Sequence, residues 1–211
     1  MSKSKIQLQP GKVYHIWSHA NGDENLFRNR ENYNYFLEKY IYYIHPIADT
    51  FAYCLMPNHF HLMVRLKEET VVLKHLKKRQ NETTSNGRAD LAGVRNLSGL
   101  ISKQFSNLFN SYTKSFNKSH NRKGSLFKRP FNRKSINSQT YYTHLIAYIH
   151  NNPVHHGFVD HPADWPFSSW HAYVLDKATN ISKEEAQNWF NDDFDAIHAE
   201  LNHKNYMPVL E

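Results

Sequence analysis

The residues with the clearest capacity for chemistry are two histidines in a short stretch that alternates between polar and apolar side chains. His59 and His61 flank Phe60, between a Met-Pro-Asn turn and a Leu-Met-Val run. In a strand, successive side chains point to opposite faces, so the two imidazoles share one face and lie about 7 Å apart. Such a pair can converge on one metal ion. The alternative is two half-exposed strand residues, so a metal site needs a further ligand from elsewhere.

A second candidate group lies near Asn152, in a segment that is predicted to be a helix over residues 139–151 with Ser138 as its N-cap. On a helical wheel, the apolar side gathers Tyr142, Leu145, Ile146 and Ile149. Tyr148 lies roughly 100° from the centre of that side and shares a separate face with His144 and Asn152. This position suits a nucleophilic tyrosine, and the alternative is a ring that packs under a loop. Pro153 is predicted to end the helix, which leaves Asn152 as either a metal ligand or a C-terminal cap.

The elements that must position these groups follow from hydrophobic periodicity and turn residues. Strands are predicted at residues 12–20, 48–56, 59–66 and 131–136, and helices at 31–44, 70–79, 97–116, 139–151 and 182–201. This order predicts an α+β fold with a ferredoxin-like antiparallel sheet packed with helices, followed by a C-terminal helical tail. The predicted catalytic domain covers residues 1–175, with a polar, flexible insertion at 80–96, and an acidic tail covers 176–211.

Positive charge is concentrated in one part of the chain. The whole chain carries a net charge of +7, yet residues 91–159 contain no Asp or Glu. A basic surface interleaved with aromatic side chains is typical of nucleic-acid binding, because phosphates pair with the cations and bases stack on the rings. The alternative is a solvated basic face without a partner. The predicted DNA-binding residues are Lys103, Lys114, Lys118, Arg122, Lys123, Lys128, Arg129, Arg133 and Lys134.

Composition excludes several other classes of protein. Cys54 is the only cysteine among 211 residues, which excludes an internal disulfide framework and a cysteine-based zinc site. The first residues lack the apolar core of a signal peptide, and no stretch approaches the roughly 20 apolar residues of a membrane helix. We therefore expect a cytoplasmic protein without a membrane partner.

Two blocks of the sequence resemble a known family. The block Leu-Met-Pro-Asn-His-Phe-His-Leu-Met-Val at residues 55–64 is similar to the HUH motif (His, bulky hydrophobe, His) of single-tyrosine transposases. The block Ala-Tyr-Ile-His-Asn-Asn-Pro-Val-His-His-Gly-Phe-Val at 147–159, with Pro-Ala-Asp-Trp-Pro-Phe-Ser-Ser at 162–169, resembles the tyrosine block of REP-associated tyrosine transposases. These are domesticated relatives of the insertion-sequence-200-like enzymes. The resemblance covers roughly residues 10–175.

The resemblance implies a ferredoxin-like fold and a set of roles. Tyr148 takes the position of the nucleophile, and His59, His61 and Asn152 take the positions of ligands to Mg²⁺ or Mn²⁺. The implied substrate is single-stranded DNA with palindromic hairpins, which is cleaved and rejoined through a 5′-phosphotyrosine. Two alternatives stay open, a non-catalytic nucleic-acid-binding protein and a metal-dependent hydrolytic nuclease. The sequence also leaves open whether the protein is a monomer or a homodimer.

Overall fold

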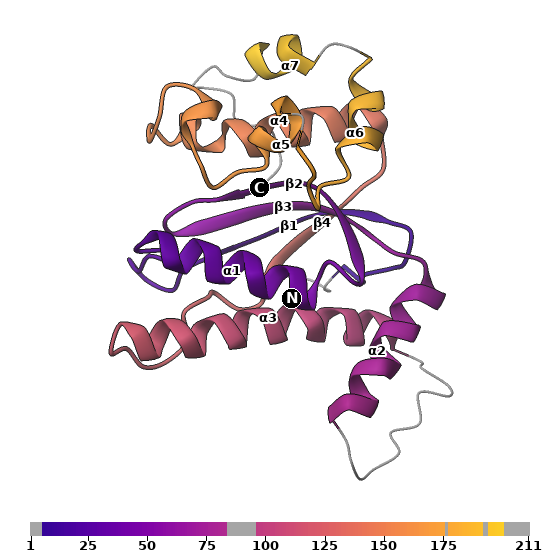
Figure 1. Ribbon diagram of the computed structural model, residues 1–211, viewed down its shortest axis with the longest axis vertical. Helices are drawn as coiled ribbons and strands as arrows, with labels where there is room; N and C mark the ends of the chain where they lie inside the picture. Colours follow the sequence, from indigo (N-terminus) through magenta and orange to yellow (C-terminus); the bar gives the residue numbers. More distant parts are fainter. Residues whose placement is uncertain (1–5, 84–95, 176, 192–193, 201–211) are drawn as a thin grey trace, which may run out of the picture.

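The fold is built on one antiparallel sheet. The computed structural model describes residues 6–83, 96–175, 177–191 and 194–200. Its strands are β1 (Val13–His19), β2 (Ala48–Leu55), β3 (His59–Leu66) and β4 (Asn132–Ile136), in the spatial order β2-β3-β1-β4 (Figure 1). Every neighbouring pair is antiparallel. The predicted α+β, ferredoxin-like class is confirmed, and the predicted strands lie within one residue of the observed ones.

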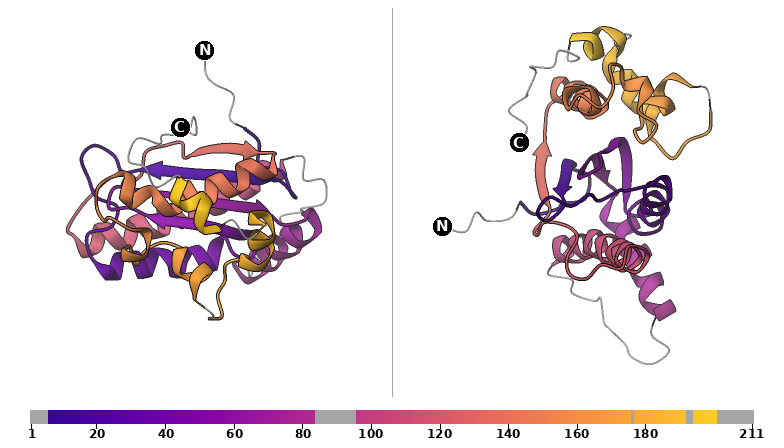
Figure 2. Two further views of the ribbon diagram at one scale, coloured as in Figure 1. Left: turned by 90° about the horizontal axis from the view of Figure 1, so that it is seen from above. Right: turned by 90° about the vertical axis from the view of Figure 1, so that its left-hand side faces the viewer.

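One face of the sheet is covered by α1 (Arg30–Tyr43) and α3 (Leu97–Ser119), with α2 (Glu69–Thr83) beside them (Figures 1 and 2). Asn29 and Asn96 begin α1 and α3, because their side-chain oxygens accept hydrogen bonds from the backbone N–H groups of Asn32 and Gly99. Between this layer and the sheet lies a core rich in aromatic side chains, including Phe36, Phe60, Phe105, Phe109 and Tyr112.

The other face of the sheet is covered by α4 (Gln139–His155), with α5 (Trp170–Val174), α6 (Lys183–Phe190), α7 (Phe194–Glu200) and the 3-10 turn Pro162–Asp164 around it (Figures 1 and 2). Ser138 caps α4 as predicted and accepts a hydrogen bond from the backbone N–H of Tyr141. The second core cluster lies here and joins Met63 of β3 to Leu145 and Ile149 of α4.

The predicted end of α4 was wrong. Pro153 lies inside the helix, which continues to His155. Proline removes the hydrogen bond that its own nitrogen would donate, but the groups after it can still bond. The backbone N–H of His156 donates to the carbonyl of Asn152, and that of Phe158 donates to the carbonyl of Pro153. Asn152 therefore keeps helical geometry and points from α4 toward the sheet.

The C-terminal part differs from the predicted single helix over 182–201. Asn191 adopts the left-handed conformation, with φ of 48°, and ends α6. Arg65 of β3 is 2.9 Å from a carboxylate oxygen of Glu185 in α6, and Phe190 is buried in the second core cluster. Helices α6 and α7 both pack against α4, on the same side of the sheet. The boundary at residue 175 stays a prediction.

Two further expectations concern the insertion and the membrane. Residues 80–83 of the predicted insertion continue α2, and 84–95 lie outside the described residues. Among the helices that the structure describes, none is long and apolar enough to span a membrane.

Candidate active site

The two predicted metal-binding histidines lie on the α4 side of β3. Alternation along β3 puts Phe60 into the aromatic core and both His59 and His61 under α4. The imidazole of His59 is 3% exposed and that of His61 is fully buried. They are therefore not the half-exposed strand residues of the alternative interpretation.

His59 lies between two amide oxygens. Its Nδ1 is 2.8 Å from Oδ1 of Asn58, and its Nε2 is 2.9 Å from Oδ1 of Asn152. Burial, which is the largest cause, lowers the pKa of His59 to about 4, so the ring is neutral at pH 7 and carries one proton. A neutral imidazole can donate to only one of these oxygens. The other ring nitrogen then presents its lone pair to an oxygen lone pair, an arrangement that a cation between them would stabilise.

His61 is held by a histidine of the neighbouring strand. Its Nδ1 is 2.9 Å from Nε2 of His15 on β1, and the two rings stack with centroids 5.1 Å apart. Nε2 of His61 has no hydrogen-bond partner among the described residues, although it is buried. Burial holds the pKa of His61 well below its usual range and lowers the pKa of His15 to about 3. Both rings are therefore neutral at pH 7. If Nδ1–H of His61 donates a hydrogen bond to Nε2 of His15, then Nε2 of His61 keeps a lone pair that can bind a metal.

The donor set fits a divalent cation. Nε2 of His59 and Oδ1 of Asn152 are separated by 2.9 Å, close to the roughly 3.0 Å between adjacent ligands of octahedral Mg²⁺ at about 2.1 Å. The buried amide nitrogen of Asn152 has no partner among the described residues, so the side chain is not a helix cap. In the same part of the chain, no three His, Cys, Asp or Glu side chains converge as a metal site. The third donor would have to be this amide, and the metal stays a prediction.

Tyr148 lies against the histidines. Its ring centroid is 5.5 Å from that of His61 and 6.3 Å from that of His15, in both cases edge to face. The side chain is only 2% exposed and belongs to the second core cluster, although its wheel position is about 100° from the apolar side of the helix. The reason is that the His59–His61 face of the sheet is itself covered by α4, and a wheel position about 100° from the apolar side still points into that layer.

This chain is similar to known proteins in sequence and in fold. A REP-associated tyrosine transposase of Haemophilus influenzae is 27% identical over 132 residues, which make up 62% of this chain and 63% of the relative. The chain therefore aligns with less than two thirds of the curated relative it matches. A solved structure of a REP-associated tyrosine transposase bound to a REP hairpin superposes with a TM-score of 0.59 at 20% identity, over 87% of this chain and 96% of that chain. No family model matches the sequence.

The resemblance to REP-associated tyrosine transposases is confirmed. At its level of identity, the solved structure supports the shared fold. The structure brings together the four predicted site residues, His59 and His61 from β3 and Tyr148 and Asn152 from successive turns of α4. His144 is half-buried one turn before Tyr148 and is not among the contacts of this cluster.

The predicted DNA-binding residues of this transposase-like chain fall into separate groups. Lys103, Lys114, Lys118 and Lys123 are exposed on or just after α3. Arg122 is bonded to Glu24, with Nε 2.8 Å from a carboxylate oxygen, and so is held within the protein. The two basic residues of β4 point to opposite faces of the sheet. Arg133 points toward Ser102 of α3, whereas Lys134 lies beside His15 and over the ring of Tyr141 on the α4 side.

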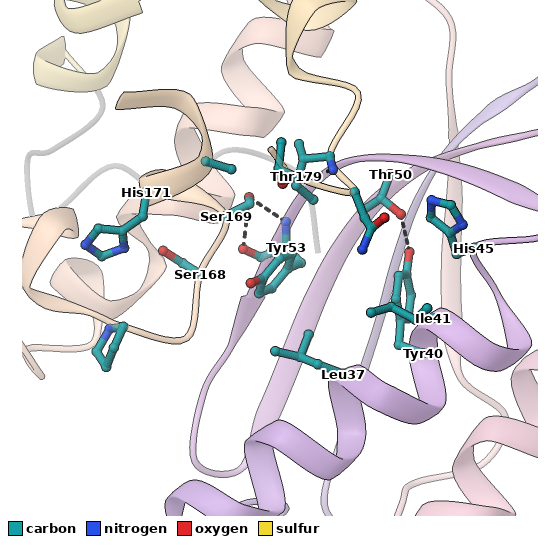
Figure 3. Close-up of a pocket in the computed structure, with 14 residues that line it drawn as sticks. Leu37, Tyr40, Ile41, His45, Thr50, Tyr53, Ser168, Ser169, His171 and Thr179 are labelled. Atoms are coloured by element: carbon teal, nitrogen blue, oxygen red, sulfur yellow. Dashed lines mark hydrogen bonds between the residues drawn. The ribbon is translucent and has the colours of Figure 1, made fainter. Parts of the chain in front are cut away.

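Two cavities lie at opposite edges of the sheet. The first has a volume of about 490 Å³ and lies between α1, β2 and residues 166–181 (Figure 3). Tyr40 and Thr50 are hydrogen-bonded in its wall, as are Tyr53 and Ser169, and the described residues of its lining include no Lys or Arg. The second, about 400 Å³, lies between α3 and residues 127–133 and is lined by three of the predicted DNA-binding cations. Of these two cavities, the second therefore has the positive charge that suits a phosphate.

Three further histidines, for which the sequence predicts no role, lie at this candidate site. His15 holds His61, and the rings of His19 and His156 each lie 4.9 Å from the ring of His59. The sequence contains a pattern that could have indicated His15 and His19, because these residues are four apart along β1 and therefore lie on the same face of the strand. That signal becomes informative only when β1 is known to pair with β3, where His19 lies opposite His59.

Proposed function

We propose that this protein cleaves and rejoins single-stranded DNA through a covalent 5′-phosphotyrosine on Tyr148, with a divalent cation held by His59, His61 and Asn152. The observation that carries the proposal is the convergence of these four side chains. The ring of Tyr148 packs against that of His61, while Nε2 of His59 faces Oδ1 of Asn152 at 2.9 Å. A relative named as a REP-associated tyrosine transposase and the hairpin-bound transposase of the same fold support a hairpin DNA as substrate.

The protein's own groups have distinct roles in this proposal. Nε2 of His59, Nε2 of His61 and Oδ1 of Asn152 would hold Mg²⁺ or Mn²⁺, and the bound cation would polarise the non-bridging oxygens of the scissile phosphate. Asn58 and His15 accept from the Nδ1 nitrogens of the two ligands and so fix their tautomers. Because both imidazoles are neutral, they leave the cation its full charge toward an anionic phosphate.

The covalent step exchanges one phosphate ester for another. The hydroxyl oxygen of Tyr148 forms a bond to phosphorus, and the bond from phosphorus to the 3′-oxygen of the preceding nucleotide breaks. The tyrosine proton leaves to a base, and the departing 3′-oxygen takes up a proton as a free hydroxyl. Attack by a 3′-hydroxyl on the phosphotyrosine reverses the exchange, so the energy of the phosphodiester is kept for rejoining.

The closed state of the site sets a requirement for this reaction. Tyr148 and both histidines are buried, so in this proposal the tyrosine oxygen must become accessible before a phosphate can reach it. The basic residues at the neighbouring edge of the sheet, including Lys134 beside His15, would bring the phosphate backbone to this point.

The test is a denaturing gel of a labelled DNA hairpin with unpaired flanks after incubation with protein and Mn²⁺. We expect a denaturation-resistant adduct with the wild type and at least a roughly 1,000-fold lower yield with Tyr148→Phe, which removes the attacking oxygen. Tyr141→Phe, on the same helix two turns earlier, is the matched control and should keep the adduct. An undiminished adduct with Tyr148→Phe would contradict the assignment, and peptide mapping of that adduct would identify the true nucleophile.

A second candidate function is favoured by one observation, the burial of Tyr148. A nucleic-acid-binding protein that does not cleave would keep this tyrosine in its core at all times. The same gel separates the candidates. DNA binding without cleavage under any metal condition selects the binding protein, and cleavage without an adduct selects a hydrolytic nuclease.

A further inference from the structure

The cavity beside β4 combines aromatic walls with a cationic entrance. Its volume of about 400 Å³ is within the range of small-ligand sites. Phe109 of α3 and Phe127 of the loop before β4 form its base, with ring centroids 4.9 Å apart. Phe131 forms a third wall at 5.6 Å from Phe109 and is only half-buried, so part of its ring faces the cavity.

Polar groups line the same cavity. The guanidinium of Arg133 lies 4.8 Å from the ring centroid of Phe131 and donates a hydrogen bond of 2.8 Å to Ser102. Arg129 donates to the amide oxygen of Asn110 over 2.6 Å, and Lys128 is exposed at the entrance. Among the described residues that line the cavity, none carries a carboxylate. Flat apolar walls, an amide and hydroxyls, and cations at the entrance together match one unpaired nucleotide, with its base inside and its phosphates outside.

The backbone connects this cavity to the catalytic end of the sheet. The N–H of Lys128 donates to the carbonyl of His19 over 2.8 Å, and the hydroxyl of Ser18 donates to the carbonyl of Lys128. The ring of His19 stacks on that of His59 at 4.9 Å. A DNA strand that places a phosphate near His59 therefore passes the cavity entrance within a few nucleotides.

We propose that this cavity binds one unpaired base of the DNA strand close to the scissile phosphate, stacked on Phe131, with its flanking phosphates at Lys128 and Arg129. The inference rests on the proposed function for its substrate class, and it adds a second recognition point on the other side of β4. The base holds the strand in register, so that one phosphate and not its neighbours is presented to Tyr148.

The experiment measures binding and not cleavage. DNA oligonucleotides with a stable hairpin and an unpaired extension are prepared with one abasic site at each position of the extension in turn. Fluorescence anisotropy gives the dissociation constant of each for wild type, Phe131→Ala and Phe131→Leu. The leucine variant keeps apolar packing against Phe105 and Phe109, so folding is preserved without the aromatic face. Tyr42→Ala removes an exposed aromatic ring from α1 and is the matched control.

We expect one extension position at which the abasic site weakens wild-type binding about 5- to 150-fold, the range of base–aromatic stacking. The same abasic site should change the affinity of Phe131→Leu far less, because the stacking surface is already absent, whereas Tyr42→Ala should behave as wild type. 2-Aminopurine at that position should be quenched by the wild type and less by Phe131→Leu. The proposal is overturned if no position is sensitive, or if Phe131→Leu weakens intact and abasic DNA equally. A base-sensitive position in a protein that forms no adduct would retain the cavity assignment and remove the covalent chemistry.

Discussion

The two faces of the sheet use the same strands for opposite purposes. On β3, Phe60 enters the α1–α3 core and contacts Phe36 and Phe109, while its neighbours His59 and His61 enter the α4 layer. One layer is a set of interlocking aromatic rings. The other layer holds buried neutral imidazoles, and Nε2 of His61 and Nδ1 of His15 have no hydrogen-bond partner within the part of the chain that the structure describes.

This contrast separates stability from chemistry. Apolar rings gain free energy when they leave water, so the α1–α3 face stabilises the fold. A buried imidazole nitrogen without a partner costs free energy, and proteins retain such groups where a ligand satisfies them. Two layers on one sheet therefore show which residues the fold needs and which residues the site needs.

The largest effect is expected from paired substitutions on β3. Phe60→Ala should lower the free energy of unfolding by about 3–5 kcal/mol, because it leaves a cavity among close-packed rings. His61→Leu, of similar volume, should lower it by only about 1–3 kcal/mol, because it leaves no cavity but takes the hydrogen-bond partner from Nε2 of His15, and it should abolish Mn²⁺ binding. Urea unfolding of the metal-free protein measures both. A loss as large for His61→Leu as for Phe60→Ala would make the histidine layer structural and break the comparison.

A smaller effect concerns acid, and it acts on the α4 layer through a second histidine pair. Nδ1 of His150 in α4 is 3.0 Å from Nε2 of His198 in α7, and Nε2 of His150 is 2.8 Å from the hydroxyl of Ser169. Burial lowers the pKa of His198 to about 4 and holds the pKa of His150 well below its usual range, and the titratable side chains of His161 and His171 lie near this pair.

The unfolded chain therefore binds more protons than the folded chain between about pH 4 and pH 6.5, and stability should fall as pH falls through this window. When the pH is lowered from about 7.5 to about 5.5, each of these two histidines should lower the free energy of unfolding by about 1 kcal/mol. Urea unfolding at the two pH values measures this change. In His198→Phe, which keeps a ring against Trp170 and Phe190, the change should shrink by about that amount. An unchanged pH dependence would mean that the pair is not buried as described.

The smallest effect on stability is expected from Asn152→Ala. Its side chain contacts His59 and not a backbone group, and the carbonyl of Asn152 already accepts from the N–H of His156. The free energy of unfolding without metal should therefore change by less than about 0.5 kcal/mol, whereas loss of a helix cap typically costs about 1 kcal/mol. The concentration of Mn²⁺ for half-maximal binding, followed by electron paramagnetic resonance, should rise about tenfold. An unchanged Mn²⁺ titration would exclude Asn152 as a ligand.

The strands could be predicted from the sequence because alternation along β1 and β3 is regular and Pro57-Asn58 marks the turn between them. The continuation of α4 through Pro153 could not, because tertiary contacts of Asn152 and Val154 outweigh the local preference of proline. Similarly, the role of His15 depends on the register of β1 against β3, which no local pattern contains. The cavity beside β4 depends on how residues 127–133 meet α3, a contact between distant segments.

The burial of Tyr148 has a consequence for selectivity. If the layer of α4 over β3 opens only in a small fraction of molecules, then any DNA that needs the open form binds with an affinity reduced by that fraction. Each 1.4 kcal/mol of opening free energy costs tenfold. Random single strands, which contact the basic edge by charge alone, gain too little to populate the open form. Under the proposed function, a strand that also fits the proposed base cavity would populate it, so the free energy of opening would set the threshold that distinguishes a target from other single-stranded DNA.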